Sequence, residues 1–275
     1  MNQDQIEYWN GRAGQNWAKQ QDYTDQILGH ITEAFIPFAA PKPGESVLDI
    51  GCGCGTTTFT YAQCVGREGS VAGIDISAPM LAVARARADA SHADIPFIEA
   101  DASTYDFQPV FDLVASRFGV MFFEDPSAAF RNIRKALAPK GRLAFVCWRA
   151  MEENGWAATP IKAARPLLPP QETPEPQAPG PFAFADAKRI EVILSSAGFK
   201  DIHIEKFDGH MDMAPTAEEA AMRTMTIGPL SRAIADADDA TKAKVRDVVT
   251  RALKVYATPH GVRGPVACWF VRARP

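Results

Sequence analysis

The chain has 275 residues, 47% of them hydrophobic and 23% charged, a composition typical of globular proteins and not of disordered or fibrous ones. Its 29 Lys and Arg against 33 Asp and Glu give a net charge of −4, which argues against a general nucleic-acid binder, because such proteins usually carry a basic excess. No apolar stretch approaches the ~18 residues of a membrane span, the first residues do not resemble a signal peptide, and the five cysteines are odd in number. The sequence therefore predicts a cytoplasmic protein with reduced thiols.

In chain order, residues 1–40 predict amphipathic helices, which the run Pro41-Lys-Pro-Gly44 would end. Short apolar runs then alternate with helical segments, and this alternation implies a parallel sheet with helices on both faces. The five strands expected here are Ser46–Ile50, Val71–Asp75, Pro96–Glu99, Phe111–Ser116 and Arg142–Trp148. The side chains of Ser77 and Asp125 are expected to cap the helices that follow the second and fourth strands.

After the fifth strand the alternation stops. Eight of the 21 prolines fall between Pro160 and Pro181, and because proline continues neither a helix nor a central strand we expect an extended stretch, either a linker or a flap over a site. Asp186 predicts the start of another helix. A sixth strand is expected at Asp201–Phe207, a helical insertion at about Thr216–Tyr256 and a last strand at Val266–Arg272.

The segment that carries chemistry is a glycine-rich loop. A strand that includes Asp49 leads through Gly51, Gly53 and Gly55 into a helix that begins near Thr56. Glycines are needed where the backbone turns tightly or touches a ligand, and the free N–H groups of the helix suit a carboxylate or a phosphate. The dinucleotide fingerprint places its third glycine one residue later, where Thr56 stands. The spacing alone therefore separates the two ligand classes only modestly.

Three carboxylates follow successive strands at the same edge of this sheet. Asp49 can accept backbone N–H groups of the glycine loop and would repel a pyrophosphate. Asp75 can accept both hydroxyls of a ribose, and Asp101 can accept a hydrogen bond from an adenine amine. Each such charge-assisted bond contributes about 1.5–3 kcal/mol. Together these residues favour a nucleoside ligand that has no pyrophosphate.

With these motifs in this order, the chain resembles the class I S-adenosylmethionine-dependent methyltransferases over about residues 45–150. The run from Asp49 to Gly55 looks like their first motif, residues 111–119 their fourth, and residues 137–143 the turn into their fifth strand. The opening Tyr-Trp-Asn-Gly-Arg-Ala-Gly-Gln-Asn-Trp at 8–17 resembles the N-terminal cap of bacterial ubiquinone/menaquinone-type and small-molecule methyltransferases.

The resemblance implies an α/β fold: a Rossmann-like sheet of seven mostly parallel strands with the last antiparallel, a helical N-terminal cap and a helical insertion before the last strand. It divides the chain into a cap at 1–40, a cofactor-binding core at 41–150, a Pro-rich excursion at 151–185, a core continuation at 186–207, a helical lid at 208–263 and a final strand at 264–275. It also implies S-adenosyl-L-methionine as cofactor, S-adenosyl-L-homocysteine as product, and in-line methyl transfer to a small-molecule acceptor, with O- or C-methylation favoured.

The implied cofactor site draws on the cap and on the strand ends. Its expected residues are Trp9, Trp17, Asp49, Gly51, Cys52, Gly53, Thr56, Asp75, Ile76, Met80, Asp101, Ala102 and Ser116. The helix after the loop would hold the methionine carboxylate, while Gly51 and Ser116 would contact the amino group through their main chain. Ile76 and Met80 would border the adenosine. The two tryptophans would either approach the sulfonium or pack the cap.

No residue stands out as a general base. His210 and His260 flank the insertion, and Arg117 ends the fourth strand, where it could contact an acidic acceptor or pair with Asp125 or Glu124. No metal is expected, because the two cysteines of the glycine loop lack a second pair at ligand spacing.

Two other readings stay open at this stage. The chain could bind S-adenosylmethionine without catalysis, or it could be a nicotinamide-dependent oxidoreductase, although the glycine spacing disfavours the latter. As partners we expect a small-molecule acceptor, no nucleic acid and no membrane span, and we leave a homodimer open.

Overall fold

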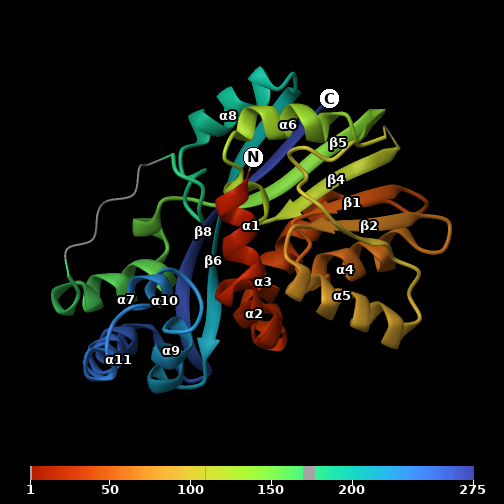
Figure 1. Cartoon of the computed structure of the whole chain (residues 1–275). Helices are drawn as coiled ribbons and strands as arrows, with labels where there is room; N and C mark the ends of the chain where they lie inside the picture. Colours follow the sequence, from red (N-terminus) through yellow and green to blue (C-terminus); the bar gives the residue numbers. More distant parts are fainter. Residues whose placement is uncertain (1, 109, 170–176) are drawn as a thin grey trace.

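The computed structural model describes residues 2–108, 110–169 and 177–275. The chain folds around an eight-stranded sheet with the order β3-β2-β1-β4-β5-β8-β6, and a short β7 pairs with β8 (Figure 1). Strands β1 to β5 run parallel, whereas β8 is antiparallel to both β5 and β6. The strands are β1 Ser46–Ile50, β2 Ser70–Asp75, β3 Phe97–Glu99, β4 Phe111–Arg117, β5 Leu137–Trp148, β6 Lys200–Ala214, β7 Ala257–Thr258 and β8 Gly261–Arg274.

Helices cover both faces of this sheet. The first group is α1 Gln3–Asn10, α2 Arg12–Lys19, α3 Gln21–Ala39, α4 Thr56–Val65, α5 Ala78–Ser91 and α6 Pro126–Arg134. The later helices are α7 Gly155–Ala164, α8 Ala187–Ser196, α9 Ala217–Thr224, α10 Pro229–Ala233 and α11 Asp239–Leu253. Helices α3, α4 and α5 lie on one side of the sheet and α6 and α8 on the other (Figure 1). The predicted mostly parallel α/β sheet with an antiparallel last strand is therefore confirmed.

The central strands form the core because both of their faces are covered. Val47 and Leu48 of β1 and Leu113 of β4 are fully buried, as the apolar runs of a parallel sheet require. On the α6 side, Phe130 packs against Phe145 of β5 with ring centres 5.5 Å apart.

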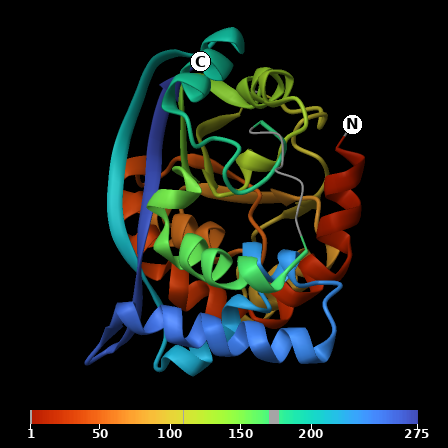
Figure 2. The same cartoon turned by 90° about the vertical axis from the view of Figure 1, so that its left-hand side faces the viewer.

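The outer strands are longer than predicted. Strand β6 continues to Ala214, which pairs with Val262 of β8, so the two strands form a long antiparallel ladder that extends beyond the parallel strands (Figure 2). Helices α9 to α11 sit at the far end of this ladder, and the inserted helices therefore begin later than residue 208. The expected turn at 138–141 is instead a bulge within β5. Leu137 pairs with Phe111 and Arg142 pairs with Leu113, so β5 has extra residues between two pairs that are only two residues apart in β4.

The prediction of an extended stretch from Pro160 was wrong at its start. Pro160 lies inside α7 and is buried. Its missing N–H removes one helical hydrogen bond, to the Trp156 carbonyl, but α7 packs against α10, α11 and β8, and this packing holds the helix. Residues 170–176 of the proline-rich stretch lie outside the described residues.

Two of the three predicted helix caps are confirmed. Asp125 accepts a hydrogen bond from the Ala128 N–H, and Asp186 accepts one from the Lys188 N–H. Ser77 precedes α5 but its hydroxyl makes no cap bond; it donates instead to the Trp9 carbonyl oxygen at 2.7 Å. The hydroxyl thus joins the N-terminal helices to the end of β2.

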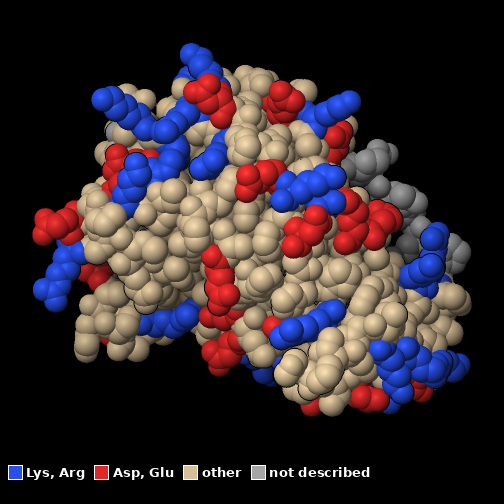
Figure 3. All heavy atoms as spheres, turned by 180° about the vertical axis from the view of Figure 1, so that it is seen from behind, with Lys and Arg blue, Asp and Glu red and all other residues tan. Residues whose placement is uncertain are grey.

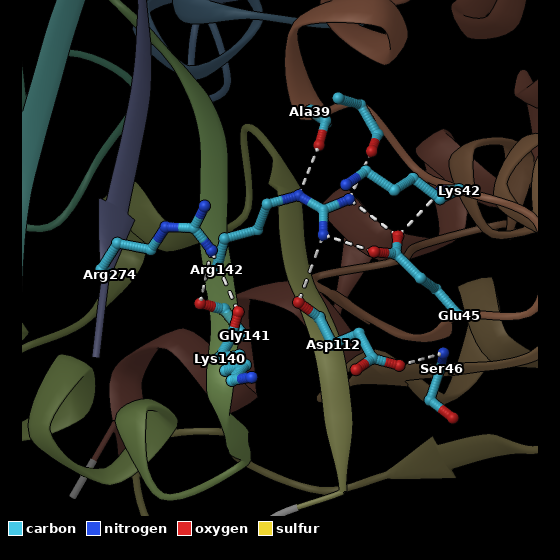
Figure 4. Close-up of polar contacts among 10 residues, drawn as sticks. Ala39, Lys42, Glu45, Ser46, Asp112, Lys140, Gly141, Arg142 and Arg274 are labelled. Carbon is cyan, nitrogen blue, oxygen red and sulfur yellow. Dashed lines mark hydrogen bonds and ion pairs between the residues drawn. The ribbon is translucent and has the colours of Figure 1, made fainter.

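An ionic junction closes the amino edge of the sheet (Figure 4). The Arg142 guanidinium donates to both carboxylate oxygens of Glu45 at 2.8 Å, and it also donates to the carbonyl oxygens of Ala39 and Ala40 at the C-terminal end of α3. The Ser46 N–H donates to Asp112 at 3.0 Å. This junction fixes the C-terminal end of α3 to β1 and β5.

On the face shown in Figure 3, acidic and basic side chains are interspersed rather than gathered into a basic stripe. Among the described residues, no helix has the length and apolarity needed to cross a bilayer.

Candidate functional site

The glycine loop between β1 and α4 has the backbone shape that its sequence predicts. Gly51, Gly53 and Gly55 have φ of +67°, +53° and +85°, a region that other residues rarely adopt. A Cβ atom on Gly51 would lie 2.6 Å from the Gly119 Cα, so the loop also passes directly against the segment after β4. A Cβ atom on Gly53 would meet only the Met80 side chain, at 3.7 Å from its sulfur, and the backbone there is otherwise open.

Asp75, at the end of β2, holds this loop in place. Its Oδ2 accepts the Gly53 N–H at 2.8 Å, and its Oδ1 accepts the Ser77 N–H at 2.9 Å. Burial raises the pKa of Asp75, although these backbone hydrogen bonds oppose the rise. Each carboxylate oxygen keeps a second lone pair, and the residue is still 8% exposed.

Asp49 does not accept backbone N–H groups of the loop, which corrects the sequence-based expectation. Its Oδ2 accepts the hydroxyls of Thr57 and Thr58, both at 2.7 Å, because the first turn of α4 lies against the end of β1. Its Oδ1 is buried and has no hydrogen-bond partner among the described residues. Burial raises the pKa of Asp49 to about 6.

Ser116 joins β4 to the loop from the other side. Its fully buried hydroxyl donates to the Ile50 carbonyl oxygen at 2.7 Å and accepts the Gly119 N–H at 3.2 Å. The neighbouring Arg117 donates to the Thr32 hydroxyl of α3 at 2.7 Å. Of the alternatives left open for Arg117, pairing with Asp125 is not seen among the described contacts, and Asp125 caps α6 instead.

Other residues predicted for the site lie around the loop at different depths. Cys52 is buried beneath it, in a small apolar cluster with Phe97 and Leu81. Ala102 is buried, and its carbonyl oxygen accepts a bond from the Asn132 amide. Thr56 donates its hydroxyl to Asp25 of α3 and so ties α4 to the N-terminal helices.

Two asparagines of the N-terminal helices, which the sequence analysis missed, span this edge of the sheet. Asn2 donates to Asp101 at 3.2 Å and accepts the Glu124 N–H at 2.8 Å. Asn10 donates to the Ile76 carbonyl oxygen at 2.8 Å and accepts the Ala78 N–H at 2.9 Å. Asn10 lies within the cap motif at 8–17, whereas nothing in the sequence pattern singles out Asn2.

The two tryptophans pack the cap against the site. Trp9 lies edge-on to Trp17 and to Phe122, with ring centres 6.1 and 5.2 Å apart. Gly14 of α2 permits this approach, because a Cβ atom there would lie 1.8 Å from the Trp9 carbonyl oxygen and 2.8 Å from the Ser77 hydroxyl. The cap therefore closes tightly over the end of β2.

The two candidate histidines lie away from this loop in the fold. His210 is on the edge strand β6 and stacks on His30 of α3 with ring centres 4.5 Å apart. His260 is exposed in the turn between β7 and β8. Neither histidine makes a hydrogen bond to the glycine loop within the described part of the chain.

Aromatic side chains connect the loop to a cavity under the inserted helices. Phe118 stacks on Trp148 at 4.1 Å, and Trp148 contacts Trp156 at 5.0 Å between ring centres. Trp156 lines a cavity of about 30 Å³ whose other walls include Tyr23 and Arg223. No sequence pattern singles out Trp156, Tyr23 or Arg223 as a site residue.

Comparison with known proteins gives a consistent picture. Residues 47–141 match the family model of a methyltransferase domain. Aklanonic acid methyltransferase DauC of a Streptomyces species is 36% identical over 143 residues, which cover 50% of this chain and 60% of that protein. Demethylmenaquinone methyltransferase of Staphylococcus saprophyticus is 26% identical over 61% of this chain and 76% of its own length. The chain thus spans about three fifths of the first of these relatives.

Solved structures share the fold at low sequence identity. The YcgJ protein of Bacillus subtilis has a TM-score of 0.58 at 15% identity, covering 90% of this chain and 98% of its own. Phosphoethanolamine N-methyltransferase 2 of Haemonchus contortus, solved with S-adenosyl-L-methionine, has a TM-score of 0.56 at 22% identity, covering 90% of this chain and 52% of its own.

Proposed function

We propose that the protein is a class I methyltransferase that transfers a methyl group from S-adenosylmethionine to a small-molecule acceptor, because residues 47–141 match the family model of a methyltransferase domain. The observation that carries this proposal is the glycine loop, whose backbone is held by Asp75 and opens toward the cap at the carboxyl edge of the sheet.

The residues present fit this cofactor. The Asp49 Oδ1 is a buried acceptor without a partner among the described residues, and it suits the cationic amino group of a methionine. The unobstructed backbone at Gly53 admits a ligand against the main chain, with Met80 at its border. Asp75 keeps lone pairs for ribose hydroxyls, and the Asp101 carboxylate already accepts an amide N–H, the donor type that an adenine amine would present.

When bound, S-adenosylmethionine supplies a methyl group that is already activated by its sulfonium. The protein therefore acts chiefly by alignment, which can be worth about 7–11 kcal/mol. The loop and the N-terminus of α4 fix one side of the cofactor site, and the cap residues Asn10 and Trp9 close it from outside. Closure of this kind excludes water from the transfer site.

The cap at 1–40, the segment 151–185 and the insertion at 208–263 provide the acceptor side of this proposal. The aromatic series from Phe118 through Trp148 to Trp156 runs from the glycine loop to their shared cavity. The described side chains that line this cavity include no histidine and no carboxylate. We therefore favour an acceptor atom that needs no general base, either an already ionised oxygen or an activated carbon.

A second candidate function is binding of S-adenosylmethionine without catalysis, as in a sensor. The contact between Asn2 and Asp101 favours it, because an adenine amine bound to the same Asp101 oxygen would release Asn2 and so change the N-terminal segment. An enzyme and a sensor differ in whether the cofactor is consumed.

Two measurements test the proposal. Calorimetric titration with S-adenosylhomocysteine is expected to show binding at one site per chain. Incubation with S-adenosylmethionine and a panel of aromatic acids, phenols, quinols and amines is expected to yield S-adenosylhomocysteine and one methylated compound by mass spectrometry. Absence of binding in the titration would overturn the cofactor assignment, whereas binding without turnover across the panel would favour the sensor.

We also propose that the protein works in a reducing compartment such as the cytoplasm. All five cysteines are free thiols, and three of them, Cys52, Cys147 and Cys268, are buried in the core. The interspersed charges on the face shown in Figure 3 support a small molecule as partner more than a nucleic acid.

A further inference from the structure

Arg223 is an arginine whose hydrogen-bonding groups meet no acceptor in the described chain. It lies in the last turn of α9, partly buried, with its guanidinium carbon 4.1 Å from the centre of the Tyr23 ring. A guanidinium carries five N–H donors, and none of them binds a described carboxylate or carbonyl oxygen. A partly desolvated charge of this kind is costly unless something pairs with it.

The surroundings of Arg223 are apolar and aromatic. The cavity beside it is lined by Tyr23, Trp156, Met211 and Met213, and its volume of about 30 Å³ holds a water molecule or two. Methionine side chains are unbranched and flexible, so this wall can yield to a larger flat group. Trp156 and Tyr23 offer rings against which such a group can pack.

The charge of Arg223 is not neutralised by its neighbour. The Tyr23 hydroxyl donates to the Met213 carbonyl oxygen at 3.0 Å, and burial raises the pKa of Tyr23 to about 12. Tyr23 therefore stays uncharged at neutral pH, and the cavity carries a net positive charge at the Arg223 end.

This cavity is connected to the glycine loop. Trp156 contacts Trp148, Trp148 stacks on Phe118, and the residue after Phe118 is Gly119, whose Cα faces Gly51. A molecule that fills the cavity would contact Trp156, the end of the aromatic series that packs against the glycine loop.

We propose that the acceptor is a flat aromatic compound with an anionic group, a carboxylate or an ionised phenol, and that Arg223 binds this group. The inference rests on the methyltransferase function proposed above. The planar fork of a guanidinium matches a carboxylate, and the same positive charge disfavours amines that are protonated at neutral pH. Arg223 is thereby a specificity-determining residue in the wall of the cavity, while the ring of the acceptor packs on the aromatic side chains that line it.

Two probes that share a ring but differ in charge separate the contribution of the anionic group to binding from that of the ring. We would titrate 2-naphthoate and its uncharged analogue 2-naphthamide into the full chain saturated with S-adenosylhomocysteine, following tryptophan fluorescence. The wild-type protein is expected to bind the naphthoate about tenfold or more tightly than the amide. Arg223→Leu should remove this preference while leaving the amide affinity within about twofold, and Arg223→Lys should keep part of it.

The control variant is Arg251→Leu, which removes an exposed arginine from α11 of the same insertion. It should retain the wild-type preference, and thermal melting of all three variants checks that they fold. Equal affinity for the two probes, no binding of either at millimolar concentration, or a preference that survives Arg223→Leu would each overturn the inference. Binding of S-adenosylhomocysteine is measured first, so loss of the proposed function itself would be visible separately.

Discussion

Strand β1 has an acidic residue near each end, and the surroundings of the two shift their pKa values in opposite directions. At the amino edge, burial of Glu45 would raise its pKa, but hydrogen bonds from Arg142 and the Lys42 N–H lower it overall. At the carboxyl edge, burial raises the pKa of Asp49 to about 6, and one of its oxygens has no partner among the described residues. The acidic group at the amino edge therefore has its hydrogen-bond donors within the protein, whereas the acidic group at the carboxyl edge keeps an oxygen free for a ligand.

Two arginines that lie near opposite ends of α3, Arg142 and Arg223, show the same difference. Arg142 donates to the carbonyl oxygens that follow the helix and to both oxygens of Glu45, whereas Arg223 meets only the face of Tyr23 in the described chain. An arginine that is paired with buried acceptors destabilises the fold when it is removed. An arginine without acceptors is available to bind an anionic ligand, which would offset the cost of its partial desolvation. Loss of a charged group at the amino edge should therefore affect stability, and loss of a charged group at the carboxyl edge should affect binding.

The largest effect is expected from Arg142→Leu. It leaves the Glu45 carboxylate and two carbonyl oxygens without their donor, and we expect a loss of about 3 kcal/mol in the free energy of unfolding. Chemical denaturation would measure this loss, with Arg274→Leu as the control, because Arg274 donates to the carbonyl oxygens of Lys140 and Gly141 and pairs with no carboxylate among the described residues (Figure 4). If the two variants were equally stable, the junction would not hold this edge together.

Next in size is Gly14→Ala, compared with Gly29→Ala. A Cβ atom on Gly14 would meet the Trp9 carbonyl oxygen at 1.8 Å, so the cap must shift, at about 1–3 kcal/mol. Gly29 lies in α3 with nothing within 4 Å of its Cβ position, and alanine there should gain about 0.5–1 kcal/mol. Melting temperatures that move in opposite directions would support the tight cap, and a neutral Gly14→Ala would contradict it.

Asp75→Asn should weaken S-adenosylhomocysteine binding about tenfold, because it removes the charge from an acceptor that holds the loop and faces the proposed ribose site. Asp112→Asn is the matched control: this aspartate also accepts a backbone N–H, from Ser46, but at the amino edge. Calorimetry of both variants compares the two edges directly. If Asp75→Asn and Asp112→Asn lost the same amount of affinity, Asp75 would not contact the cofactor and would only help to hold the folded structure.

The smallest effect is a pH dependence that arises from Asp49. Because its pKa is raised to about 6, the carboxylate gains a proton as the pH falls through that value and loses its attraction for a cationic amino group. S-adenosylhomocysteine affinity should fall about fourfold between pH 7.5 and 5.5, as roughly three quarters of the sites protonate. In Asp49→Asn, affinity at pH 7.5 should already be weak and should change little with pH. A wild-type affinity independent of pH would exclude contact between Asp49 and the amino group.

Much of the fold followed from local signals in the sequence. The β1 boundaries were predicted to the residue, because Ser46–Ile50 is an apolar run between a proline-glycine turn and the glycine loop. The lengths of β6 and β8 were underestimated, since their outer halves alternate irregularly and depend on pairing with each other. Pro160 was misread because proline strongly disfavours helices locally, and only tertiary packing of α7 reverses that preference.

The candidate site was predictable where backbone geometry requires a residue type. The three glycines are needed for positive φ, and Asp75 follows from its position at the end of a strand. Contacts between segments distant in sequence were not predictable, and they changed the role of Asp49 and introduced Asn2 and Asn10. Arg223 gave no signal at all, because a lone arginine in a helical insertion is typical of a solvated surface.

Helix α3 spans 19 residues, or about 28 Å, and joins the Arg142 junction at one end to the Tyr23 wall of the cavity at the other. Its C-terminal end is anchored, so the direction in which Tyr23 points is set by the helical phase counted back from Ala39. Each residue contributes about 100° of rotation, and a single insertion or deletion within the helix would turn Tyr23 away from Arg223 while leaving the anchor intact. The number of residues between the anchor and the cavity is therefore fixed. Side-chain substitutions can change the shape of the cavity, but a change in the length of α3 would misplace Tyr23.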